Sequence, residues 1–336
     1  MAIKVFLTGA TGYIGGSVLS ALLAHKKYTY EIVALVRGTD RAAKLESLGV
    51  KTVQGSLDDA AVLEQYSRWA DIVIHTADAD HVAAAEAILK GMEAGAEGRQ
   101  RKPILVHTSG TGVLLDKARG QTASDKIFHD SQLETYNTLP LDQPHRNVDV
   151  LVLEAGKRGK IDTVIVCPPL IYGRGTGPFK TISQQVPLMI RGALARGKAG
   201  YIGNGANIWS NVHVQDLAEF YVLLIESLWE GKAPVGAEGY YFCENGTEHD
   251  FRTLAQKIAE ELKKQGGIGD GKADSVPEDQ VLKVFGENAY MQLSGNSRSR
   301  ADKARKLGWK PTQKGLYESV GEDVERLLEE YHMHIA

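Results

Sequence analysis

The stretch IKVFLTGATGYIGGS, residues 3–17, decides the fold class of this chain. Its apolar beginning, Ile3 to Leu7, predicts a buried β-strand, and helix-like sequence from Ser17 to Ala24 follows almost at once. A helix that starts directly after a strand presents free N–H groups and the positive end of its dipole at that junction. Such a junction is suited to the phosphates of a nucleotide.

Three glycines in the junction support the same interpretation. Gly9 permits a tight turn out of the strand, Gly12 lets the backbone approach a pyrophosphate, and Gly15 lets the helix pack closely on the strand. The spacing is Gly-x-x-Gly-x-x-Gly, which differs from the usual Gly-x-Gly-x-x-Gly pattern. A glycine-rich turn that binds no ligand is the alternative, and the strand-turn-helix context argues against it. The residues that we expect to contact a dinucleotide cofactor here are Gly9, Thr11, Gly12, Tyr13, Ile14 and Gly15.

Length and composition restrict the class of protein. A chain of 336 residues suits one large domain or two coupled domains. The net charge of -3 gives no electrostatic support for binding nucleic acid or an anionic membrane surface. No run approaches the ~20 apolar residues of a membrane span. The two cysteines, Cys167 and Cys243, show no metal-ligand spacing and fit a reducing compartment, so we expect a cytoplasmic protein.

Short apolar runs alternate with helical segments along most of the chain. The predicted strands are Lys4–Leu7, Glu31–Val36, Lys51–Gln54, Ile72–His75, Ile104–Thr108, Thr163–Cys167 and Tyr240–Cys243. The predicted helices between and after them are Ser17–Ala24, Asp40–Leu48, Asp59–Arg68, Val82–Glu93, Arg146–Arg158 and Gln215–Trp229. Continuously hydrophobic strands that alternate with helices are typical of a parallel sheet covered on both faces. We therefore predict an α/β protein with a Rossmann-type, doubly wound parallel sheet.

The pattern changes after about residue 170, where loops and less regular segments become frequent. The later helices that we predict are Ser183–Ala195, Phe251–Lys264 and Lys314–Tyr331. We expect residues 1–175 to form a dinucleotide-binding domain, to which residues 208–245 return. Residues 176–207 and 246–336 would form a smaller substrate-binding cap over the carboxyl edge of the sheet, where open α/β sheets bind ligands.

Five motifs follow one another in a fixed order: TGATGYIG at residues 8–15, VHTSGT at 106–111, PPLIYG at 168–173, WSNVHVQDLA at 209–218 and LGWKP at 307–311. With these motifs the chain resembles the extended short-chain dehydrogenase/reductase family, which holds sugar-nucleotide epimerases and dihydroflavonol-type reductases. The resemblance implies a Rossmann fold, a nicotinamide cofactor and a small organic substrate.

The end of the second strand indicates which nucleotide is bound. In proteins that resemble this chain, an acidic residue there binds the ribose 2′-hydroxyl, whereas an arginine binds a 2′-phosphate. This chain has Arg37 and no acidic residue at that strand end, so we expect NADP(H) rather than NAD(H). A surface arginine paired with Asp40 is the alternative. The further cofactor contacts that the resemblance implies are Leu57, Thr76, Ala77, Pro168 and Leu170.

The resemblance also implies a catalytic serine, a tyrosine and a lysine four residues after the tyrosine. Ser109 matches the serine that holds the substrate carbonyl, with Thr111 beside it, although a hydroxyl that only caps a turn is the alternative. The tyrosine and lysine are missing. When Glu154 is aligned with the glutamate that follows the family's lysine, Arg146 takes the tyrosine position and a valine takes the lysine position.

Three interpretations of the missing pair remain open. In the first, the protein is an NADPH-dependent reductase of a carbonyl or imine with a substitute acid. The candidate is His145, four residues before Asp149, because histidine titrates near neutral pH; contact with solvent or Asp149 at the helix start is the alternative role for His145. Tyr136 or Tyr172 could also reach in from loops. In the second interpretation, the protein binds NADP(H) without turnover and acts as a redox sensor. In the third, the substrate needs little proton help from the protein.

Three further possibilities receive less support. A sugar-nucleotide epimerase would need an efficient base, and the base position is empty. The segment Asp78 to His81 has residue types of a metal site, but it lies at a helix start, where acidic side chains satisfy free N–H groups, so we expect no metal. Small residues on Val82–Glu93 suit either a homodimer contact or packing against the sheet.

Overall fold

The computed structural model, which describes residues 2–335, contains a seven-stranded sheet in which all neighbouring strands are parallel. From one edge to the other the strands are β3 (Lys51–Gln54), β2 (Tyr30–Val36), β1 (Ile3–Thr8), β4 (Ile72–His75), β5 (Ile104–Thr108), β7 (Asp162–Cys167) and β11 (Tyr240–Phe242). The chain changes direction across the sheet between β1 and β4. Doubly wound sheets bind their ligands at the carboxyl ends of the strands beside such a point.

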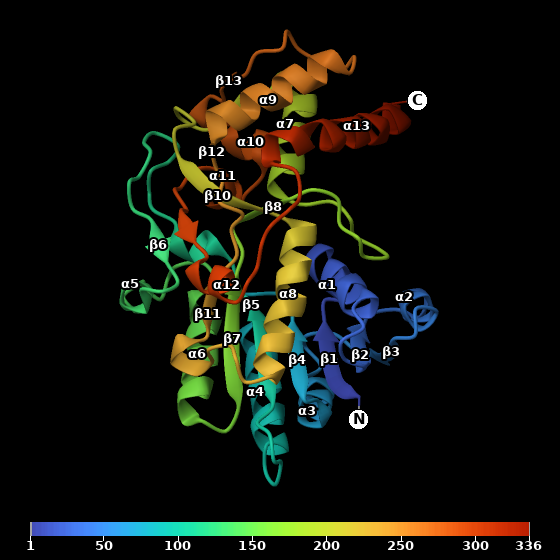
Figure 1. Cartoon of the computed structure of the whole chain (residues 1–336). Coiled ribbons are helices and arrows are strands. Elements are labelled where there is room, and N and C mark those ends of the chain that lie inside the picture. The colour runs from blue at the N-terminus through green and yellow to red at the C-terminus, as the bar shows by residue number, and fades with distance from the viewer. Residues whose placement is uncertain (1, 336) are drawn as a thin grey trace.

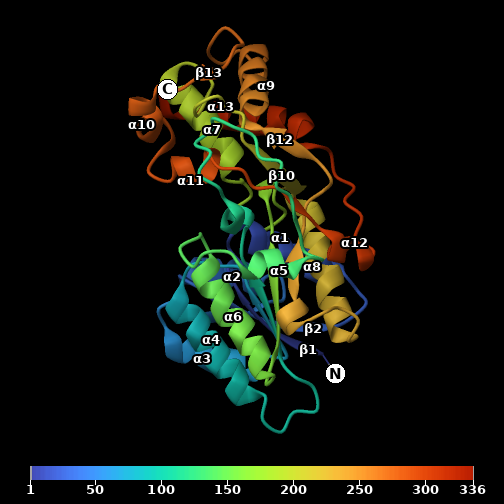
Figure 2. The same cartoon turned by 90° about the vertical axis from the view of Figure 1, so that its left-hand side faces the viewer.

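Helices cover both faces of this sheet (Figures 1 and 2). The helices of this part are α1 (Tyr13–Ala24), α2 (Thr39–Glu46), α3 (Ala60–Trp69), α4 (Val82–Gly95), α6 (Arg146–Arg158) and α8 (Val214–Trp229). α1 and α8 pack together on one face, and α3, α4 and α6 pack on the other. Since β4 and β5 lie between two helical layers, each of their residues is buried, as continuously apolar strands require.

The small residues of α4 are used for packing within the chain. A Cβ atom on Gly91 would lie 2.3 Å from the backbone oxygen of Glu64, and one on Gly95 would lie 2.4 Å from the backbone oxygen of Arg68. Both contacts are with α3, so this surface of α4 is already covered. The small residues of α4 therefore no longer support a homodimer contact, and the homodimer itself stays a prediction.

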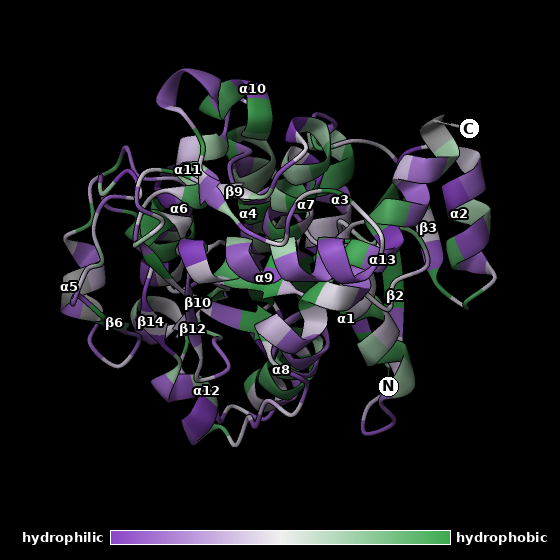
Figure 3. Cartoon of the chain, turned by 90° about the horizontal axis from the view of Figure 1, so that it is seen from above, coloured by the Kyte–Doolittle hydropathy of each residue, from purple (hydrophilic) through white to green (hydrophobic). Residues whose placement is uncertain are grey.

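A cap lies above the carboxyl edge of the sheet and has its own apolar core (Figure 1). Its strands are β8 (Leu170–Tyr172), β10 (Ile208–His213) and β12 (Glu248–Asp250), which form one sheet, and β9 (Gly200–Tyr201) and β13 (Asp274–Ser275), which form another. Its helices are α7 (Gln185–Arg196), α9 (Phe251–Lys264), α10 (Val281–Phe285), α11 (Ala289–Leu293) and α13 (Leu316–Ile335). Figure 3 shows hydrophilic and hydrophobic residues alternating along α9, which crosses the top of the cap. Its apolar residues, such as Ile258, are buried in the cap core.

The remaining elements are short. They are β6 (Phe128–His129), β14 (Ser299–Arg300), α5 (Leu133–Asn137), α12 (Asp302–Lys306) and the 3-10 turns η1 (Thr111–Leu114), η2 (Gly236–Glu238) and η3 (Glu278–Gln280). Some residues also pack into the core of the other part of the molecule. Leu170 and Tyr172 lie in the cap core, whereas Ala301, Ala304 and Trp309, from the C-terminal part of the chain, lie in the core of the large sheet.

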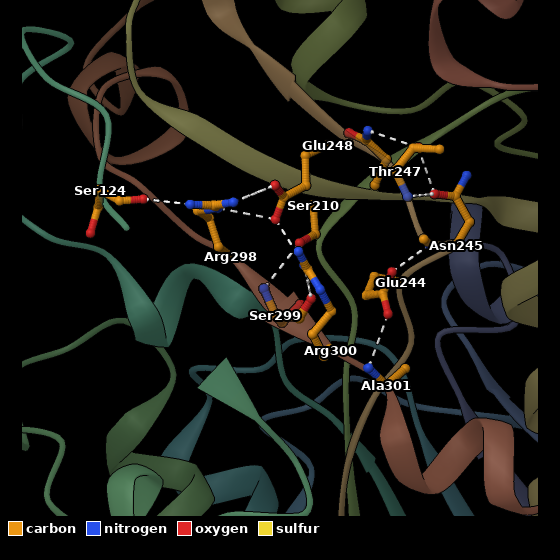
Figure 4. Close-up of polar contacts among 12 residues, drawn as sticks. Ser124, Ser210, Glu244, Asn245, Thr247, Glu248, Arg298, Ser299, Arg300 and Ala301 are labelled. Atoms are coloured by element: carbon orange, nitrogen blue, oxygen red, sulfur yellow. Dashed lines mark hydrogen bonds and ion pairs between the residues drawn. The ribbon is translucent and has the colours of Figure 1, made fainter. Parts of the chain in front are cut away.

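An ion-pair cluster fastens the returning C-terminal segment to the cap (Figure 4). Arg298 Nη2 lies 2.8 Å from Glu248 Oε2, and Arg300 Nη1 lies 2.8 Å from Glu248 Oε1. Arg298 also donates to the backbone oxygen of Ser124. The side chains of Arg298 and Glu248 are only 15% and 20% exposed, so water screens this pair less than it screens a surface ion pair.

The structure confirms the predicted fold class and the order of the main elements, and it differs at several ends. α1 begins at Tyr13 rather than at Ser17, and β11 ends at Phe242 rather than at Cys243. The sequence predicts a turn around Tyr136, whereas the structure places this residue in the five-residue helix α5. Helices this short contain too few residues for a detectable hydrophobic period, which explains why α5 and the short helices of the cap escape prediction.

Candidate functional site

The carboxyl ends of β1, β4, β5 and β7 open into a cavity of about 420 Å³ beneath the cap. The large sheet contributes Gly12–Ile14, Thr76–Asp80, Thr108–Gly112 and Pro168–Pro169 to its wall. The cap contributes Ile171, Lys180, Gln184, Gln185, Trp209, Met291 and Gln292. The volume lies within the range of roughly 300–1,000 Å³ that is usual for sites of small molecules.

The glycine loop has the geometry of a phosphate cradle. Gly9 has a φ angle of 84°, and the Gly12 N–H donates to its carbonyl oxygen at 2.8 Å. A Cβ atom on Gly15 would lie 2.3 Å from both the Gly9 oxygen and Thr76 Oγ1, so a side chain at this position would force the loop apart. The N-cap residue of α1 is Gly12, which offers no side chain to the N–H groups of the first turn. These N–H groups are available to an anion.

Two hydrogen bonds hold the rim of this cradle. Thr76 Oγ1 donates to the backbone oxygen of Thr8 at 2.7 Å and thereby fixes the loop after β4 against β1. The Tyr13 hydroxyl donates to the backbone oxygen of Gly173 at 2.6 Å and joins the glycine loop to the loop after β8. Ala77, beside Thr76, is exposed and lines the cavity. The structure therefore brings Gly12, Tyr13, Thr76 and Ala77 together at one wall.

The residues predicted for the adenosine end lie outside the cavity. Arg37 follows β2 and is exposed, and within residues 2–335 its side chain has no hydrogen-bond or ion-pair partner. The pairing with Asp40 that the sequence leaves open is therefore not formed. Leu57 is half-buried and packs against the core of the large sheet. The guanidinium of Arg37 is free to meet a ligand at the carboxyl end of β2.

The short strand β8 points its neighbouring residues Leu170 and Ile171 to opposite sides, and the sequence does not show which of the two faces the cavity. Pro168 lines the cavity, and its backbone oxygen accepts a hydrogen bond from the Thr111 N–H at 2.9 Å. The side chain of Leu170 is fully buried in the cap core, whereas Ile171 lines the cavity. Successive side chains of a strand point to opposite faces. The structure thus offers Ile171, and not the predicted Leu170, to a ligand in this cavity.

His145 is held at the cavity wall by Asp80. Its Nδ1 lies 2.9 Å from Asp80 Oδ1, and its backbone N–H donates to the same oxygen at 2.9 Å. Its Nε2 faces the loop after β5, since a Cβ atom on Gly110 or Gly112 would lie 3.2 or 3.3 Å from it. His145 precedes α6 with a φ angle of 68°, which side chains rarely adopt. The side chain of His145 therefore pairs with Asp80, from the loop after β4, and not with Asp149, which the sequence leaves open as an alternative.

The two hydroxyl groups predicted to hold a carbonyl both lie at this wall. Ser109 and Thr111 line the cavity and are 6% and 1% exposed. Ser109 Oγ donates to Asp149 Oδ2 at 3.0 Å. Thr111 Oγ1 is buried and has no partner within the described chain. A buried hydroxyl without a partner is rare.

Behind Ser109 lies a carboxyl group that is closed to solvent. Asp149 is fully buried, and its Oδ2 also accepts a hydrogen bond from the Tyr136 hydroxyl at 2.6 Å. Burial raises the pKa of Asp149 to about 6, although the hydrogen bonds from Tyr136 and Ser109 act in the opposite direction. The buried guanidinium of Arg146 lies over the ring of Tyr136, 4.5 Å from its centroid. Asp149 therefore belongs to a buried polar cluster directly beneath the cavity wall.

Neither tyrosine that the sequence offers as a substitute acid reaches the cavity. Tyr136 is 3% exposed, and its hydroxyl donates a hydrogen bond to Asp149. Tyr172 is buried in the cap core, where its hydroxyl donates to the backbone oxygen of Lys314. Burial raises the pKa of Tyr136 well above its ordinary value, so its phenol stays protonated at neutral pH.

Residues 5–235 match the model of the NAD dependent epimerase/dehydratase family. The chain belongs to this family. Among its relatives, the oxidase ucsJ from Acremonium sp is 32% identical over 338 residues, which cover 93% of each chain. A 4-hydroxy-2-methyl-3-oxo-4-farnesyl-3,4-dihydroquinoline-1-oxide ketoreductase from Stigmatella aurantiaca is 26% identical over 264 residues, which cover 76% of this chain and 72% of the ketoreductase.

Solved structures of other proteins share the fold of this chain over nearly its whole length. A dTDP-glucose 4,6-dehydratase from Bacillus anthracis in complex with NAD has a TM-score of 0.68 at 17% identity, and the alignment covers 98% of this chain and 97% of that one. A UDP-glucose 4-epimerase from Thermotoga maritima has a TM-score of 0.67 at 15% identity, with 98% and 100% covered. At these identities the likeness concerns the fold alone.

The glycine loop of this epimerase/dehydratase family member fits the nicotinamide cofactor that the family binds. A side chain on Gly15 would fill the cradle, and the first turn of α1 offers its N–H groups to a diphosphate. Within residues 2–335, no group of three or more His, Cys, Asp and Glu side chains is arranged to hold a metal ion. The side chain of His81 caps α4, because it accepts a hydrogen bond from the Ala84 N–H.

No helix in the described part of the chain is both long enough and apolar enough to cross a membrane.

Two residues of the site escape sequence reasoning altogether, Asp80 as the partner of His145 and Asp149 as the partner of Ser109. Asp80 lies 65 positions before His145 and Asp149 lies 40 positions after Ser109, so no local spacing connects either pair. One signal was available, because Asp80 follows a strand of the sheet and every loop after such a strand faces the same crevice.

Proposed function

We propose that this member of the epimerase/dehydratase family is an NADP(H)-dependent oxidoreductase that reduces a carbonyl or imine group of a small organic substrate. The observation that carries the proposal is the convergence of the Ser109 and Thr111 hydroxyls and the His145 imidazole on one cavity beside the glycine loop. The relatives described as an oxidase and a ketoreductase support the same class of reaction. An open cavity with proton donors in its wall supports an enzyme more than a non-catalytic sensor.

The chain's own residues have distinct roles in this proposal. A bound dihydronicotinamide would supply the hydride. Thr111 Oγ1, which has no partner in the described chain, donates a hydrogen bond to the substrate oxygen, and Ser109 contacts the same oxygen. The Asp80 carboxylate orients His145 through Nδ1, so that a proton on Nε2 faces the oxygen on which negative charge develops.

The cavity lining supports an uncharged substrate more than a nucleotide sugar. Among the described residues of the wall, Asp78 and Asp80 carry carboxylates, and Lys180 is the one lysine or arginine. A nucleotide sugar would bring a second diphosphate beyond the one that the glycine loop would hold, and charge-assisted pairs with Arg or Lys are strong contacts for phosphate. The indole N–H of Trp209 already donates to the backbone oxygen of Gly295, so the ring offers apolar surface to a ligand. Met291 is 40% exposed, although it is a large apolar side chain.

The preference for NADP(H) rests on Arg37. Its guanidinium is exposed, has no partner within the described chain and stands at the carboxyl end of β2, where a 2′-phosphate would lie. A cytoplasmic location is part of the same proposal and is supported by the free thiols of Cys167 and Cys243. Light scattering of the purified protein tests the homodimer that remains a prediction.

The direct test is the consumption of NADPH by the purified protein with a panel of aldehydes, ketones and imines. We expect turnover with at least one class and a loss of roughly 100-fold or more in His145→Gln, because general acid catalysis contributes roughly 10²–10⁴-fold. Thr111→Val should raise KM and lower kcat, whereas the exposed control Thr312→Val should do neither. Tight NADPH binding without turnover of any compound would refute the proposal and favour a redox sensor.

A further inference from the structure

Ser109 is the link between the cavity and a carboxyl group that solvent does not reach. The Ser109 side chain lines the cavity, and its Oγ lies 3.0 Å from Asp149 Oδ2. Asp149 is 0% exposed and is absent from the cavity wall. Its other hydrogen-bond partner, Tyr136, is 3% exposed and also does not line the cavity. Any change in the protonation of Asp149 is therefore transmitted to the cavity through the Ser109 hydroxyl.

Among the buried groups around Ser109, Asp149 is the one that changes charge near neutral pH. The titratable or charged side chains near it are Tyr136 on α5, His107 on β5, Cys167 on β7, Tyr240 on β11, Arg146 on α6 and His145 directly before α6. Burial lowers the pKa of His107 well below its ordinary value and raises the pKa of the thiol and of both phenols. These four groups stay neutral, and the Arg146 guanidinium stays charged. The pKa of Asp149, in contrast, is raised to about 6.

The Ser109 hydroxyl has one proton to donate, and the protonation state of Asp149 determines the direction in which that proton points. When Asp149 is ionised, it is an acceptor only, and the Ser109 proton points toward it, as in the hydrogen bond described above. Ser109 then presents only lone pairs to the cavity, which suit the hydroxyl of an alcohol. When Asp149 is protonated, it donates to Ser109 Oγ, and the Ser109 proton turns toward the cavity, where it suits a carbonyl oxygen.

We propose that Asp149 is a positioning residue that sets the direction of the Ser109 hydrogen bond, so that the site recognises a carbonyl when Asp149 is protonated and an alcohol when it is ionised. This inference rests on the proposed function, because it assumes that Ser109 contacts the reacting oxygen. Oδ1 of Asp149 has no hydrogen-bond partner among the described residues and lies 3.8 Å from His107 Nε2. It keeps its lone pairs whether Asp149 is ionised or carries a proton on Oδ2. The affinity for a carbonyl compound and the affinity for an alcohol should therefore change in opposite directions as the pH rises.

Complexes that cannot react make this dependence measurable as binding. Cyclohexanone is titrated into the protein saturated with NADP⁺, and cyclohexanol into the protein saturated with NADPH, between pH 5 and pH 8. One hydrogen bond gained or lost should change Kd roughly tenfold over this range, upward for the ketone and downward for the alcohol as the pH rises. In Asp149→Asn both dependences should disappear. His145→Gln should keep them, which separates the effect of Asp149 from the titration of the histidine.

A second measurement reports on Asp149 without any ligand. Infrared difference spectra of the protein should contain C=O stretches of protonated carboxyls that vanish as the pH rises. Asp130 and Asp323 contribute to these bands in both proteins, and the contribution of Asp149 is the part that is missing from Asp149→Asn. Tyr136→Phe removes a hydrogen bond that lowers the pKa of Asp149, so both the infrared midpoint and the binding midpoint should move to higher pH. A purely structural role of Asp149 would move the infrared midpoint alone, without a matching shift in the pH dependence of ketone binding.

The outcomes separate this inference from the proposed function. Ketone binding that keeps its pH dependence in Asp149→Asn would overturn the inference, and so would the absence of ketone binding at every pH. A carboxyl band that titrates while ketone affinity stays constant would also overturn it. If the binding and infrared predictions hold but no carbonyl compound is turned over, the inference stands as a recognition device and the proposed reductase activity fails.

Discussion

Replacing Asp149 by asparagine should change how the stability of the protein depends on pH. Burial raises the pKa of this carboxyl group to about 6 from its ordinary value of 3.8. The folded protein therefore binds the proton more tightly than the unfolded chain does. The stabilisation from this proton is fully present below about pH 4 and is lost as the pH rises from there through 6, because the unfolded chain releases its proton first.

The size of the effect follows from the shift. A difference of about 2 pKa units corresponds to about 3 kcal/mol in the free energy of unfolding. Asparagine does not titrate, so the variant should gain about 3 kcal/mol relative to the wild type between about pH 4 and about pH 7. The absolute stability of the variant is not needed, since only the change in this difference with pH is predicted.

Urea-induced unfolding of both proteins, followed by circular dichroism at several pH values, measures the effect. Burial also raises the pKa of Asp130 and of Asp323 to about 6, but these groups titrate in both proteins and cancel in the comparison. Asp142→Asn, at an exposed position, is the matched control and should show a constant difference from the wild type. A constant difference for Asp149→Asn as well would refute the argument that burial dominates the environment of Asp149.

Three other substitutions give further tests. Gly15→Ala should weaken NADPH binding at least tenfold in a fluorescence titration, because the added Cβ would lie 2.3 Å from the backbone oxygen of Gly9. Arg37→Ala should weaken NADPH binding roughly 10- to 100-fold and leave NADH binding unchanged, because a charge-assisted pair with the 2′-phosphate is lost. Glu248→Gln should lower the free energy of unfolding by roughly 1–3 kcal/mol, because two half-buried arginines lose their carboxylate.

Each of these substitutions has a matched control in the chain. Gly315→Ala adds a Cβ that would meet no atom closer than 4.0 Å, so NADPH binding should stay unchanged. Arg68→Ala removes an exposed arginine away from β2, and Glu329→Gln changes an exposed glutamate on α13. Equal losses in a substitution and its control would contradict the corresponding argument, as would an Arg37→Ala protein that still prefers NADPH.

The sequence predicts those parts of the molecule whose physical signal is local. The glycine loop is recognisable because the turn, the phosphate approach and the helix packing each need a glycine within one short segment. The strands β4 and β5 are predictable because a strand buried on both faces is apolar at every position. The position of His145 beside the cavity also follows from its place before α6 and the order of the loops.

The rest of the site depends on contacts that only the folded chain defines. Nothing near Ser109 in the sequence indicates that a buried carboxyl group accepts its hydrogen bond, because Asp149 lies on a helix that packs behind it. Likewise, the choice between Leu170 and Ile171 depends on the register of a three-residue strand. Strands this short show no alternation from which the inward face can be identified.

The burial of Trp309 in the core of the large sheet has a consequence for the synthesis of the protein. The indole N–H donates to the backbone oxygen of Asp216, and its ring lies 5.3 Å from that of Phe220 on α8. The core of the large sheet therefore lacks one of its largest side chains until the ribosome has translated nearly the whole chain. We expect nascent chains that end near residue 245 to remain sensitive to protease, and chains that extend past Trp309 to become resistant as one unit.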